Sequence, residues 1–266
     1  MPIENSIVSY PERGDYGSSK FRGNCSGLLI KDIVQHYGAK SLLDPMEGSG
    51  TARDVCAELG VEYDGFDILF GFDALTDILP PKKYDMIFCH PPYWNIIRYS
   101  DDPRDLSTIK CFEDFIDKLF KLLERLTEYL AKDGFLVLLV GDVRKKGQIY
   151  PIGAYLQVFH RKELKDKIIK VLHNNMRTTG KGRFYGDIIQ FAHEEVLVFR
   201  PWKKLTWAEL VCRALKEIGE EASCKEIYEI IEKHPKITTN PTWKATVRKE
   251  LQENAVQVER GIWKGE

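Results

Sequence analysis

The sequence predicts an α/β fold, a sheet with helices on both faces, followed by a small second domain. From about residue 28 to residue 200, helix-like and strand-like segments alternate, which implies strand–helix–strand crossovers. One strand-like segment is a continuous apolar run, typical of a strand buried in the centre of a parallel sheet. The 266 residues, 43% hydrophobic and 30% charged, are enough for one large domain and a small one.

The elements of the large domain follow one another in order. Leu28–Tyr37 is predicted as a helix that ends at Gly38, and Thr51–Leu59 as a helix that ends at Gly60. A long amphipathic helix is expected over Phe112–Leu130. The predicted strands are Ser41–Leu43, Tyr63–Phe66, Asp85–Cys89, Phe135–Val140 and Glu195–Phe199. Ligands of such sheets bind at the carboxyl ends of strands, so the residues that directly follow each strand are candidates for a site.

Residues 203–266 form a separate pattern of three helices and a hairpin. Thr206 and Ser223 are typical N-caps, the first for a helix that ends at Gly219 and the second for Cys224–Lys233. A third helix is expected from Pro241 or Thr242 to about Glu253, and residues 256–258 and 262–264 flank a turn at 259–261. Three helices and a two-stranded wing predict a winged helix-turn-helix, which leaves residues 1–202 as the larger domain.

Neither a membrane anchor nor an export signal is expected. No apolar run approaches the roughly 20 residues that cross a bilayer, and the amino terminus lacks a basic stretch followed by an apolar one. The six cysteines are scattered without a CxxC pair, which predicts neither a metal site nor a disulfide framework. We therefore expect a cytoplasmic protein without a membrane or metal partner, and the sequence leaves its oligomeric state open.

The first candidate site is residues 44–51, Asp-Pro-Met-Glu-Gly-Ser-Gly-Thr, directly after a predicted strand. Gly48 and Gly50 allow a tight turn and a close approach of the backbone to a ligand, and the following helix start offers free N–H groups. The spacing is that of neither a Walker A loop nor a GxGxxG run. Alone, such a loop is an ordinary strand–helix turn, so it indicates a ligand site only together with a second motif.

The second candidate site, His90-Pro91-Pro92-Tyr93, follows the predicted strand Asp85–Cys89. The two prolines fix the backbone and supply no N–H donor, which leaves the Pro91 carbonyl free as an acceptor. An aromatic ring held beside that carbonyl can stack on a planar base. A rigid turn is the ordinary explanation of this tetrapeptide alone. Its position about 40 residues after the first motif, at a neighbouring strand end, favours one shared site.

Together the two motifs resemble those of the DNA amino-methyltransferases, which use S-adenosylmethionine (AdoMet). Residues 44–51 resemble the AdoMet-binding motif of that family, usually DPF-x-GSGT, and residues 90–93 its catalytic tetrapeptide, usually Asp, Asn or Ser before Pro-Pro-Tyr. The resemblance covers roughly residues 20–200 and extends to four further segments: 22–27, 65–67, 134–142 and 193–200. It implies a Rossmann-like AdoMet-dependent methyltransferase sheet with helices on both faces.

The resemblance also implies a role for each matching residue. Asp44 and the turn Gly48–Gly50 would hold the methionine part of AdoMet, Asp67 would accept hydrogen bonds from the ribose hydroxyls, and Asp73 would approach the adenine. The implied cofactor-binding residues are Asn24, Cys25, Ser26, Asp44, Pro45, Met46, Gly48, Ser49, Gly50, Thr51, Asp67 and Asp73. The implied catalytic residues are His90, Pro91, Pro92 and Tyr93.

In this family's chemistry, Tyr93 would stack on a base flipped out of the duplex, since an amino group inside a stacked pair cannot reach the methyl donor. The lone pair of that amino group is delocalised into the base. Hydrogen bonds from the amino group to the Pro91 carbonyl and to the side chain of residue 90 would localise the lone pair for in-line attack on the sulfonium methyl. No metal is needed.

Residue 90 departs from the family pattern. Asp and Asn are usual in adenine-N6 enzymes and Ser in cytosine-N4 enzymes, so His90 leaves the target base open. A neutral imidazole has one acceptor nitrogen, whereas a charged imidazole only donates and would oppose catalysis. The sequence therefore predicts activity that rises with pH through the His titration. A flat profile between about pH 5.5 and 8 would count against this role.

Basic residues gather between Arg144 and Arg183, where eleven basic and two acidic residues give a net charge of +9. Such an excess suits a phosphate backbone, although a solvated helix face is the ordinary alternative. We expect a DNA-contacting insertion over residues 144–190 and further contacts from a recognition helix around Thr242–Lys249. The candidate DNA-binding residues are Arg144, Lys145, Arg177, Lys181, Arg183, Lys244 and Arg248. The C-terminal domain is nearly neutral, which keeps a protein-interaction role open.

The predicted function is a site-specific methyltransferase that modifies adenine N6 or cytosine N4 in double-stranded DNA, with a cognate restriction endonuclease as a candidate partner. One alternative is an RNA guanine-N2 methyltransferase, which shares a similar loop and a PPY tetrapeptide. Such enzymes generally carry an RNA-binding domain ahead of the catalytic one, whereas about twenty residues precede it here. A second alternative is a ligand-binding, DNA-binding regulator, which leaves the tetrapeptide unexplained.

Overall fold

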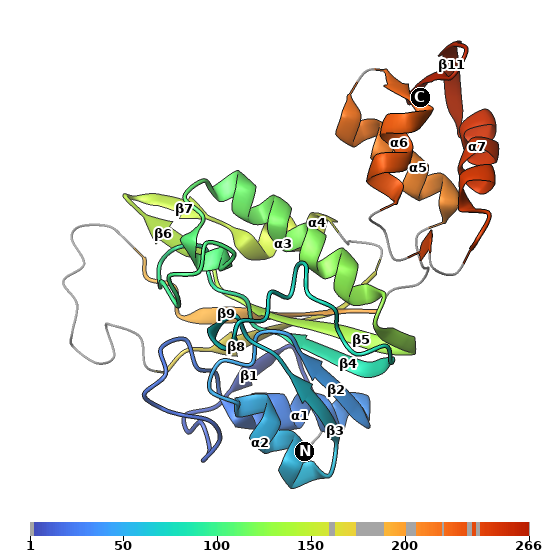
Figure 1. Cartoon of the computed structure of the whole chain (residues 1–266). Coiled ribbons are helices and arrows are strands. Elements are labelled where there is room, and N and C mark those ends of the chain that lie inside the picture. Colours follow the sequence, from blue (N-terminus) through green and yellow to red (C-terminus); the bar gives the residue numbers. More distant parts are fainter. Residues whose placement is uncertain are drawn as a thin grey trace. The chain divides into compact units, whose positions relative to one another are not determined.

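The computed structural model describes residues 3–159, 163–173, 189–200, 206–219, 221–232, 236–237 and 240–265. The chain divides into two compact units, Met1–Trp202 and Lys203–Glu266 (Figure 1). Both sequence motifs lie in the first.

A seven-stranded sheet forms the centre of the first unit (Figure 1). Its order is β1-β8-β9-β5-β4-β2-β3, and β9 is antiparallel to both of its neighbours while the other pairs are parallel. The carboxyl ends of β2, β3 and β4 therefore meet at one edge. The strands are β1 (Ile7–Ser9), β2 (Ser41–Asp44), β3 (Glu62–Gly65), β4 (Tyr84–Cys89), β5 (Leu130–Val140), β8 (Leu164–Val171) and β9 (His193–Phe199).

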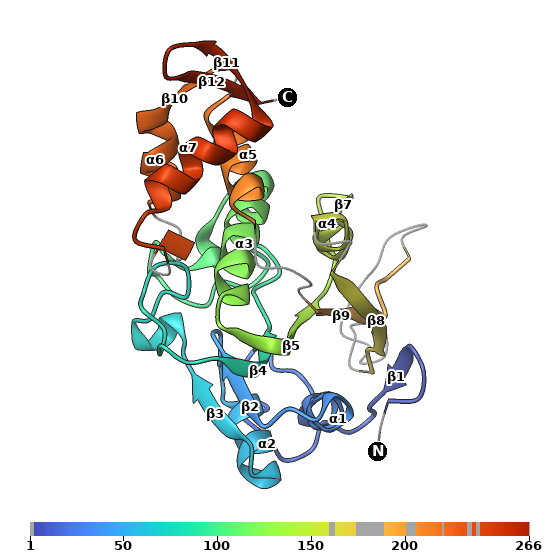
Figure 2. The same cartoon turned by 90° about the vertical axis from the view of Figure 1, so that its right-hand side faces the viewer.

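Helices cover both faces of this sheet, α1 and α2 on one side and α3 and α4 on the other (Figure 2). Successive side chains of a strand point to opposite faces. Within β5, Leu136 and Leu138 join the core under α3, whereas Val137 and Leu139 join the core under α1. Burial on both faces explains why this strand is apolar throughout. The helices are α1 (Gly27–Tyr37), α2 (Thr51–Leu59), α3 (Phe112–Thr127) and α4 (Ile152–Phe159), with two 3-10 turns, η1 (Ile68–Phe70) and η2 (Leu106–Thr108).

The predicted elements of this unit are confirmed, with bounds that shift by a few residues. Gly38 and Gly60 terminate α1 and α2 in the left-handed conformation, as expected. The largest difference lies between α3, which ends at Thr127, and β5, which already begins at Leu130.

The basic segment 144–190 corrects one expectation, because part of it belongs to the sheet. A hairpin, β6 (Val143–Lys145) and β7 (Gln148–Tyr150), and the helix α4 come first. The strand β8 then pairs with β9 and β1. This strand carries three of the segment's lysines (Lys165, Lys167 and Lys170), so its basic charge is not that of an insertion.

The second unit packs three helices around a small core with a three-stranded antiparallel sheet of order β10-β12-β11. Thr206 and Ser223 both form capping boxes at the helix starts, as their predicted N-cap positions require. Its elements are α5 (Trp207–Ile218), β10 (Ala222–Ser223), α6 (Cys224–Ile231), α7 (Trp243–Asn254), β11 (Ala255–Glu259) and β12 (Ile262–Gly265). The assignment as a winged helix-turn-helix stays a prediction.

Candidate active site

A pocket lies at the carboxyl ends of β2, β3 and β4. The loops that follow these strands supply much of its wall, as the rule for α/β sheets predicts. Residues of both sequence motifs line this pocket. Of the residues that the sequence predicts for the site, the pocket is lined by Asn24, Cys25, Asp44, Pro45, Met46, Gly48, Ser49, Thr51, Asp67, Asp73, His90 and Pro92.

Glycines and one carboxylate shape the loop between β2 and α2. Gly48 and Gly50 have φ values of 55° and 80°, in the left-handed region that favours glycine. A Cβ on Gly48 would lie 3.0 Å from the ring of Phe21. Asp67 accepts hydrogen bonds from the backbone N–H groups of Gly48 and Leu69, each at 2.8 Å. A carboxylate has about four acceptor sites, so Asp67 keeps capacity for a ligand.

Asp44 is a buried carboxyl group in the pocket wall. It is 3% exposed, and its Oδ1 accepts a hydrogen bond from the Met46 backbone N–H at 3.0 Å. Burial raises the pKa of Asp44 to about 8, against the lowering effect of this hydrogen bond, and Glu47 and Asp67 add to the rise. An ionised carboxylate in such a place is costly unless a cation pairs with it. The position therefore suits a positively charged ligand group.

The segment before α1 folds over the loop of the first motif. The Ser18 backbone N–H donates to Ser49 Oγ at 3.1 Å, and the Thr51 hydroxyl donates to Asn24 Oδ1. These contacts bring Asn24 and the buried Cys25 to the pocket.

Beyond Cys89, the tetrapeptide forms a polar chain across the sheet. His90 Nε2 lies 3.0 Å from the Tyr93 hydroxyl, and that hydroxyl donates to Glu194 Oε1 at 2.8 Å. Lys170 Nζ donates to Glu194 Oε2 at 2.6 Å. The Tyr93 ring packs closely on β5's end, since a Cβ on Gly141 would lie 2.7 Å from it. Glu194 of β9 thus contacts the tetrapeptide, and Lys170 of β8 contacts Glu194.

His90 is neutral at ordinary pH, which corrects the expected pH dependence. Burial lowers the pKa of His90 to about 4; the Glu194 carboxylate opposes this shift and the Lys170 ammonium adds to it. The sequence provided only the ordinary value of a histidine, about 6.5. A flat profile above pH 5.5 is therefore what a role for neutral His90 requires, and it no longer counts against that role.

We expect methyl transfer to be independent of His90 titration between about pH 5.5 and 8 and to fall only toward pH 4. The sign follows from the neutral form being active, because protonation below the lowered pKa removes the acceptor nitrogen. Single-turnover rates at saturating cofactor, measured across this range, provide the test. A rate that climbs tenfold per pH unit between pH 5.5 and 6.5 would contradict the neutral state of His90.

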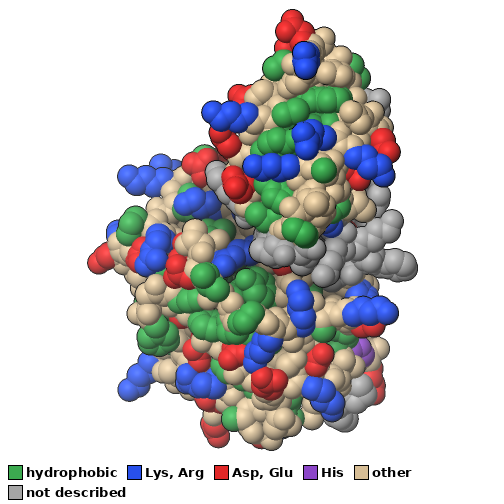
Figure 3. Space-filling view, turned by 45° about the vertical axis from the view of Figure 1, so that its right-hand side comes forward, with side chains coloured by type: hydrophobic (Ala, Val, Ile, Leu, Met, Phe, Trp, Pro, Cys, Tyr) green, Lys and Arg blue, Asp and Glu red, His purple; other side chains and the backbone are tan. Residues whose placement is uncertain are grey.

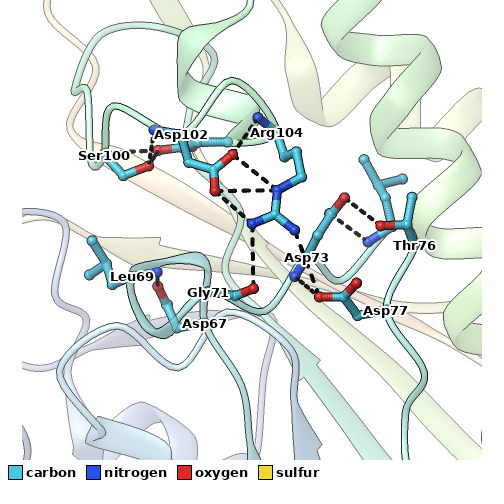
Figure 4. A network of polar contacts seen from close by, with 11 residues as sticks. Asp67, Leu69, Gly71, Asp73, Thr76, Asp77, Ser100, Asp102 and Arg104 are labelled. Atoms are coloured by element: carbon cyan, nitrogen blue, oxygen red, sulfur yellow. Dashed lines mark hydrogen bonds and ion pairs between the residues drawn. The ribbon is translucent and has the colours of Figure 1, made fainter.

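Arg104 ties two loops at the rim of the pocket (Figure 4). It donates to Asp102 Oδ2 at 2.7 Å and to the Gly71 carbonyl at 3.4 Å, and it lies 3.9 Å from Asp77. Asp77 accepts from the Asp73 backbone N–H at 2.8 Å.

The Asp73 carboxylate itself accepts hydrogen bonds from residues that follow it, from the Leu75 N–H and the Thr76 hydroxyl. A role of Asp73 toward adenine stays a prediction.

Some predicted site residues do not line the pocket, and some lining residues were not predicted. The predicted residues that do not line the pocket are Ser26, Gly50, Pro91 and Tyr93. Unpredicted lining residues include Phe21, Leu69, Phe72 and Arg104. Tyr99 also lines the pocket; it follows the catalytic loop in the sequence, where it is a candidate to contact substrate or close the site. Phe21 and Tyr99 stack with ring centroids 5.9 Å apart, a contact that no local sequence signal announces.

The candidate DNA-binding residues differ in their surroundings. Lys145 is engaged within the chain, with Nζ 2.6 Å from Asn95 Oδ1 and 4.4 Å from the centre of the Trp94 ring. Arg144 donates to the Ile189 carbonyl at 3.4 Å. Lys244 and Arg248 are exposed on α7. Arg177, Lys181 and Arg183 lie outside the described residues.

Basic side chains do not gather into one continuous area on the face shown in Figure 3, where Lys and Arg alternate with Asp and Glu. In the described part of the chain, no three His, Cys, Asp or Glu side chains are placed to hold a metal ion. None of the described helices is long and apolar enough to cross a membrane.

Comparisons with solved structures return methyltransferases. A Thermus thermophilus protein described as a DNA modification methylase is 26% identical over 48% of this chain and 51% of its own, with a TM-score of 0.34. Its complex with S-adenosyl-L-methionine aligns over 60% of this chain and 55% of its own, at 23% identity and a TM-score of 0.34. A SAM-dependent methyltransferase of Archaeoglobus fulgidus is 17% identical over 68% of this chain and 96% of its own, with a TM-score of 0.41.

The chain thus spans about half the length of the Thermus protein. No curated protein matches the chain. A family model described as DNA methylase matches residues 84–264, well over half of the chain. The match begins at the first residue of β4, and it includes the His90–Tyr93 tetrapeptide and nearly all of the second unit. The chain therefore belongs to the DNA methylase family.

Proposed function

We propose that this DNA methylase transfers a methyl group from AdoMet to the exocyclic amine of a flipped adenine (N6) or cytosine (N4) in double-stranded DNA. One observation carries the proposal: the loop of residues 44–51 and the tetrapeptide residues His90 and Pro92 line the same pocket. A methyl donor and an acceptor amine must meet in one place, and this pocket joins a ligand loop to the side chain of His90.

The pocket wall fits AdoMet. The cofactor carries an ammonium group, and the buried Asp44 carboxyl, with its single backbone hydrogen bond, suits such a partner. Asp67 has acceptor capacity for ribose hydroxyls after its two backbone hydrogen bonds. When bound, AdoMet supplies an electrophilic methyl group on a sulfonium sulfur.

The protein's part in the transfer is to orient and activate the amine. The two N–H groups of the exocyclic amine donate to the Pro91 carbonyl and to the acceptor nitrogen of His90, which reduces conjugation of the nitrogen lone pair with the ring. With AdoMet held in the pocket, its methyl group would be supplied to the amine nitrogen that Pro91 and His90 orient, and the amine would release one proton to solvent.

Tritium-labelled AdoMet incubated with duplex DNA or with tRNA, followed by nucleoside analysis, tests this function. Label in N6-methyladenine or N4-methylcytosine supports the proposal and also identifies the base. Label in N2-methylguanine of RNA would instead favour the RNA methyltransferase. Tight DNA binding without any label would favour the ligand-binding regulator, and it would overturn the proposed transfer.

The second unit supplies DNA contacts in this proposal. Lys244 and Arg248 are exposed on α7, and Lys244 Nζ lies 5.3 Å from the centre of the Trp243 ring and 5.6 Å from that of Tyr228. A cation beside aromatic rings suits a phosphate backbone with adjacent bases.

The double variant Lys244→Ala, Arg248→Ala should weaken binding of duplex DNA roughly tenfold near 0.1 M salt and should make the salt slope shallower by about 2. Fluorescence anisotropy across a salt series measures both quantities. Lys216→Ala, Lys225→Ala is the matched control, since it removes two exposed charges from α5 and α6 of the same unit. Equal affinities for the two variants would indicate that the unit contacts protein instead.

A further inference from the structure

The Tyr93 hydroxyl lies between two hydrogen-bond partners. His90 Nε2 is 3.0 Å away on one side and Glu194 Oε1 is 2.8 Å away on the other. Glu194 is held in turn by Lys170 Nζ at 2.6 Å, and the side chains of Lys170 and Glu194 are only 10% and 14% exposed. Burial of an ion pair of this kind costs free energy of desolvation, so its presence beside Tyr93 indicates a function for the pair.

The charge states of Glu194 and Tyr93 follow from their contacts. Burial acts to raise the pKa of Glu194, but the Lys170 and His90 groups and the hydrogen bonds from Lys170 and Tyr93 outweigh it, so the net shift is downward. Burial and then the Glu194 carboxylate raise the pKa of Tyr93 well above its ordinary value. Glu194 is therefore an ionised acceptor, and Tyr93 is a neutral phenol.

A neutral phenol has one proton, and an ionised carboxylate can only accept. Tyr93 must give its proton to Glu194, so its oxygen can only accept from His90. The ring nitrogen that faces Tyr93, Nε2, must then carry the imidazole proton. We propose that Glu194, held in place by Lys170, fixes His90 in the tautomer protonated on Nε2 and so keeps Nδ1 as the acceptor for the exocyclic amine.

This inference rests on the proposed function for the role of the amine, but the tautomer itself does not. A carboxylate or hydroxyl at position 90 accepts hydrogen bonds in any state, whereas a neutral imidazole accepts only through its unprotonated nitrogen. In the opposite tautomer, the Nδ1–H group would face the N–H groups of the amine. His90 lines the pocket, and the structure records no hydrogen bond to Nδ1 from any residue that it describes. Glu194 and Lys170 are thus positioning residues.

The other titratable groups that act on Tyr93, Cys25 and Tyr99, are neutral. Burial raises the pKa of the Cys25 thiol to about 12, and burial likewise raises the pKa of Tyr99. Both groups act on Tyr93, while Glu194 and Lys170 are the groups that act on His90. The tautomer is therefore set by Glu194 and Lys170 and not by a further charge.

Nitrogen NMR of the full-length protein labelled with 15N-histidine tests the tautomer without any activity. The His90 signals, assigned by their loss in His90→Asn, should show a protonated Nε2 and an unprotonated Nδ1 at pH 7. Glu194→Gln should shift His90 toward the opposite tautomer, because an amide can donate to Tyr93 and release its proton toward His90. A protonated Nδ1 in the unchanged protein, or identical spectra for Glu194→Gln, would overturn the proposal.

Glu195→Gln is the matched control for this experiment. Glu195 is the next residue of β9, and its carboxylate contacts Lys167 and Gln157 instead of the His90 chain. The control removes the same charge from the same strand, and it should leave the His90 signals unchanged. A shift as large as that of Glu194→Gln would show a general effect of charge and would contradict the specific link.

A double-mutant cycle then links the tautomer to catalysis. Glu194→Gln should lower the single-turnover rate by roughly tenfold to a hundredfold with little change in AdoMet affinity. In a His90→Asn background the same change should cost less than about threefold, since an amide oxygen accepts without a tautomer to fix. Equal losses in both backgrounds would overturn the positioning role. A protein that methylates no DNA at all contradicts the proposed function, while the NMR result still decides the tautomer.

Lys170→Met provides a second, independent readout. Without its counterion, the pKa of Glu194 should rise, so the variant should gain a pH dependence between about pH 5.5 and 8, where the unchanged protein is flat. Lys167→Met on the same strand is the control, because Lys167 pairs with Glu195. Flat profiles for both variants would contradict the part assigned to Lys170.

Discussion

Replacing Tyr93 by Ala should lower the single-turnover rate of methyl transfer on the order of 10³-fold while AdoMet affinity changes little. In the proposed mechanism, loss of the ring removes stacking on the flipped base, which contributes about 1–3 kcal/mol per base. Loss of the hydroxyl also removes the partner of His90 Nε2 at 3.0 Å, and misplacement of a reacting group by about 1 Å can cost roughly 10²-fold.

Tyr93→Phe separates these two contributions, because it keeps the ring and removes only the hydroxyl. We expect an intermediate loss for this variant. Rapid-quench assays with excess enzyme measure the rate, and calorimetric titration measures AdoMet affinity. Pro91→Ala, which loosens the backbone beside the acceptor carbonyl, should also abolish transfer while sparing the cofactor. Near-normal transfer by Tyr93→Ala would exclude the residue from the reaction.

Much of the fold could be predicted because its signals are local. Gly38 and Gly60 end helices in the left-handed conformation, and in the sequence such an end is marked by a single glycine after a segment with helical apolar periodicity. The apolar run in β5 reflects burial on both faces. Thr206 and Ser223 are typical N-cap residues, and both form capping boxes. Each of these features depends on residues no more than a few positions apart.

The strand β8 could not be predicted, because it depends on distant partners. Three of its eight residues are Lys and one is Asp, and only its pairing with β9 and β1 makes it a strand of the sheet. The contact between Lys170 and Glu194 joins residues 24 positions apart, and Tyr93 lies 101 positions before Glu194. The sequence thus identified His90 as a departure from the family pattern but did not reveal the groups that control it.

The structure also changes the expected charge state of Asp44, an acidic residue of the first motif. From the sequence alone, Asp44 is an ionised carboxylate with an ordinary pKa of about 3.9. Burial raises that pKa to about 8, so a substantial part of the protein without ligand holds Asp44 protonated at neutral pH. If Asp44 pairs with the ammonium group of AdoMet, as proposed, cofactor binding and ionisation of Asp44 are linked.

If Asp44 holds the cofactor as proposed, replacing it by Asn should weaken AdoMet binding on the order of 10²-fold, because the change would remove a charge-assisted hydrogen bond to the ammonium group in a buried site. The variant should fold. A carboxyl group whose pKa is raised in the folded state loses stability as pH rises from its unfolded value through about 8. Asn has no such charge to desolvate, so the free energy of unfolding at pH 8 should be no lower than in the unchanged protein.

The same linkage predicts a pH dependence that the variant lacks. If the ionised carboxylate binds the cofactor, the AdoMet affinity of the unchanged protein should rise between about pH 6 and pH 8, approaching tenfold per pH unit well below the pKa. Asp44→Asn should show a weak and flat affinity over this range. Calorimetric titrations at several pH values measure both, and the proton release on binding at pH 7 is an independent check. A flat affinity in the unchanged protein would show that Asp44 does not pair with the ammonium group.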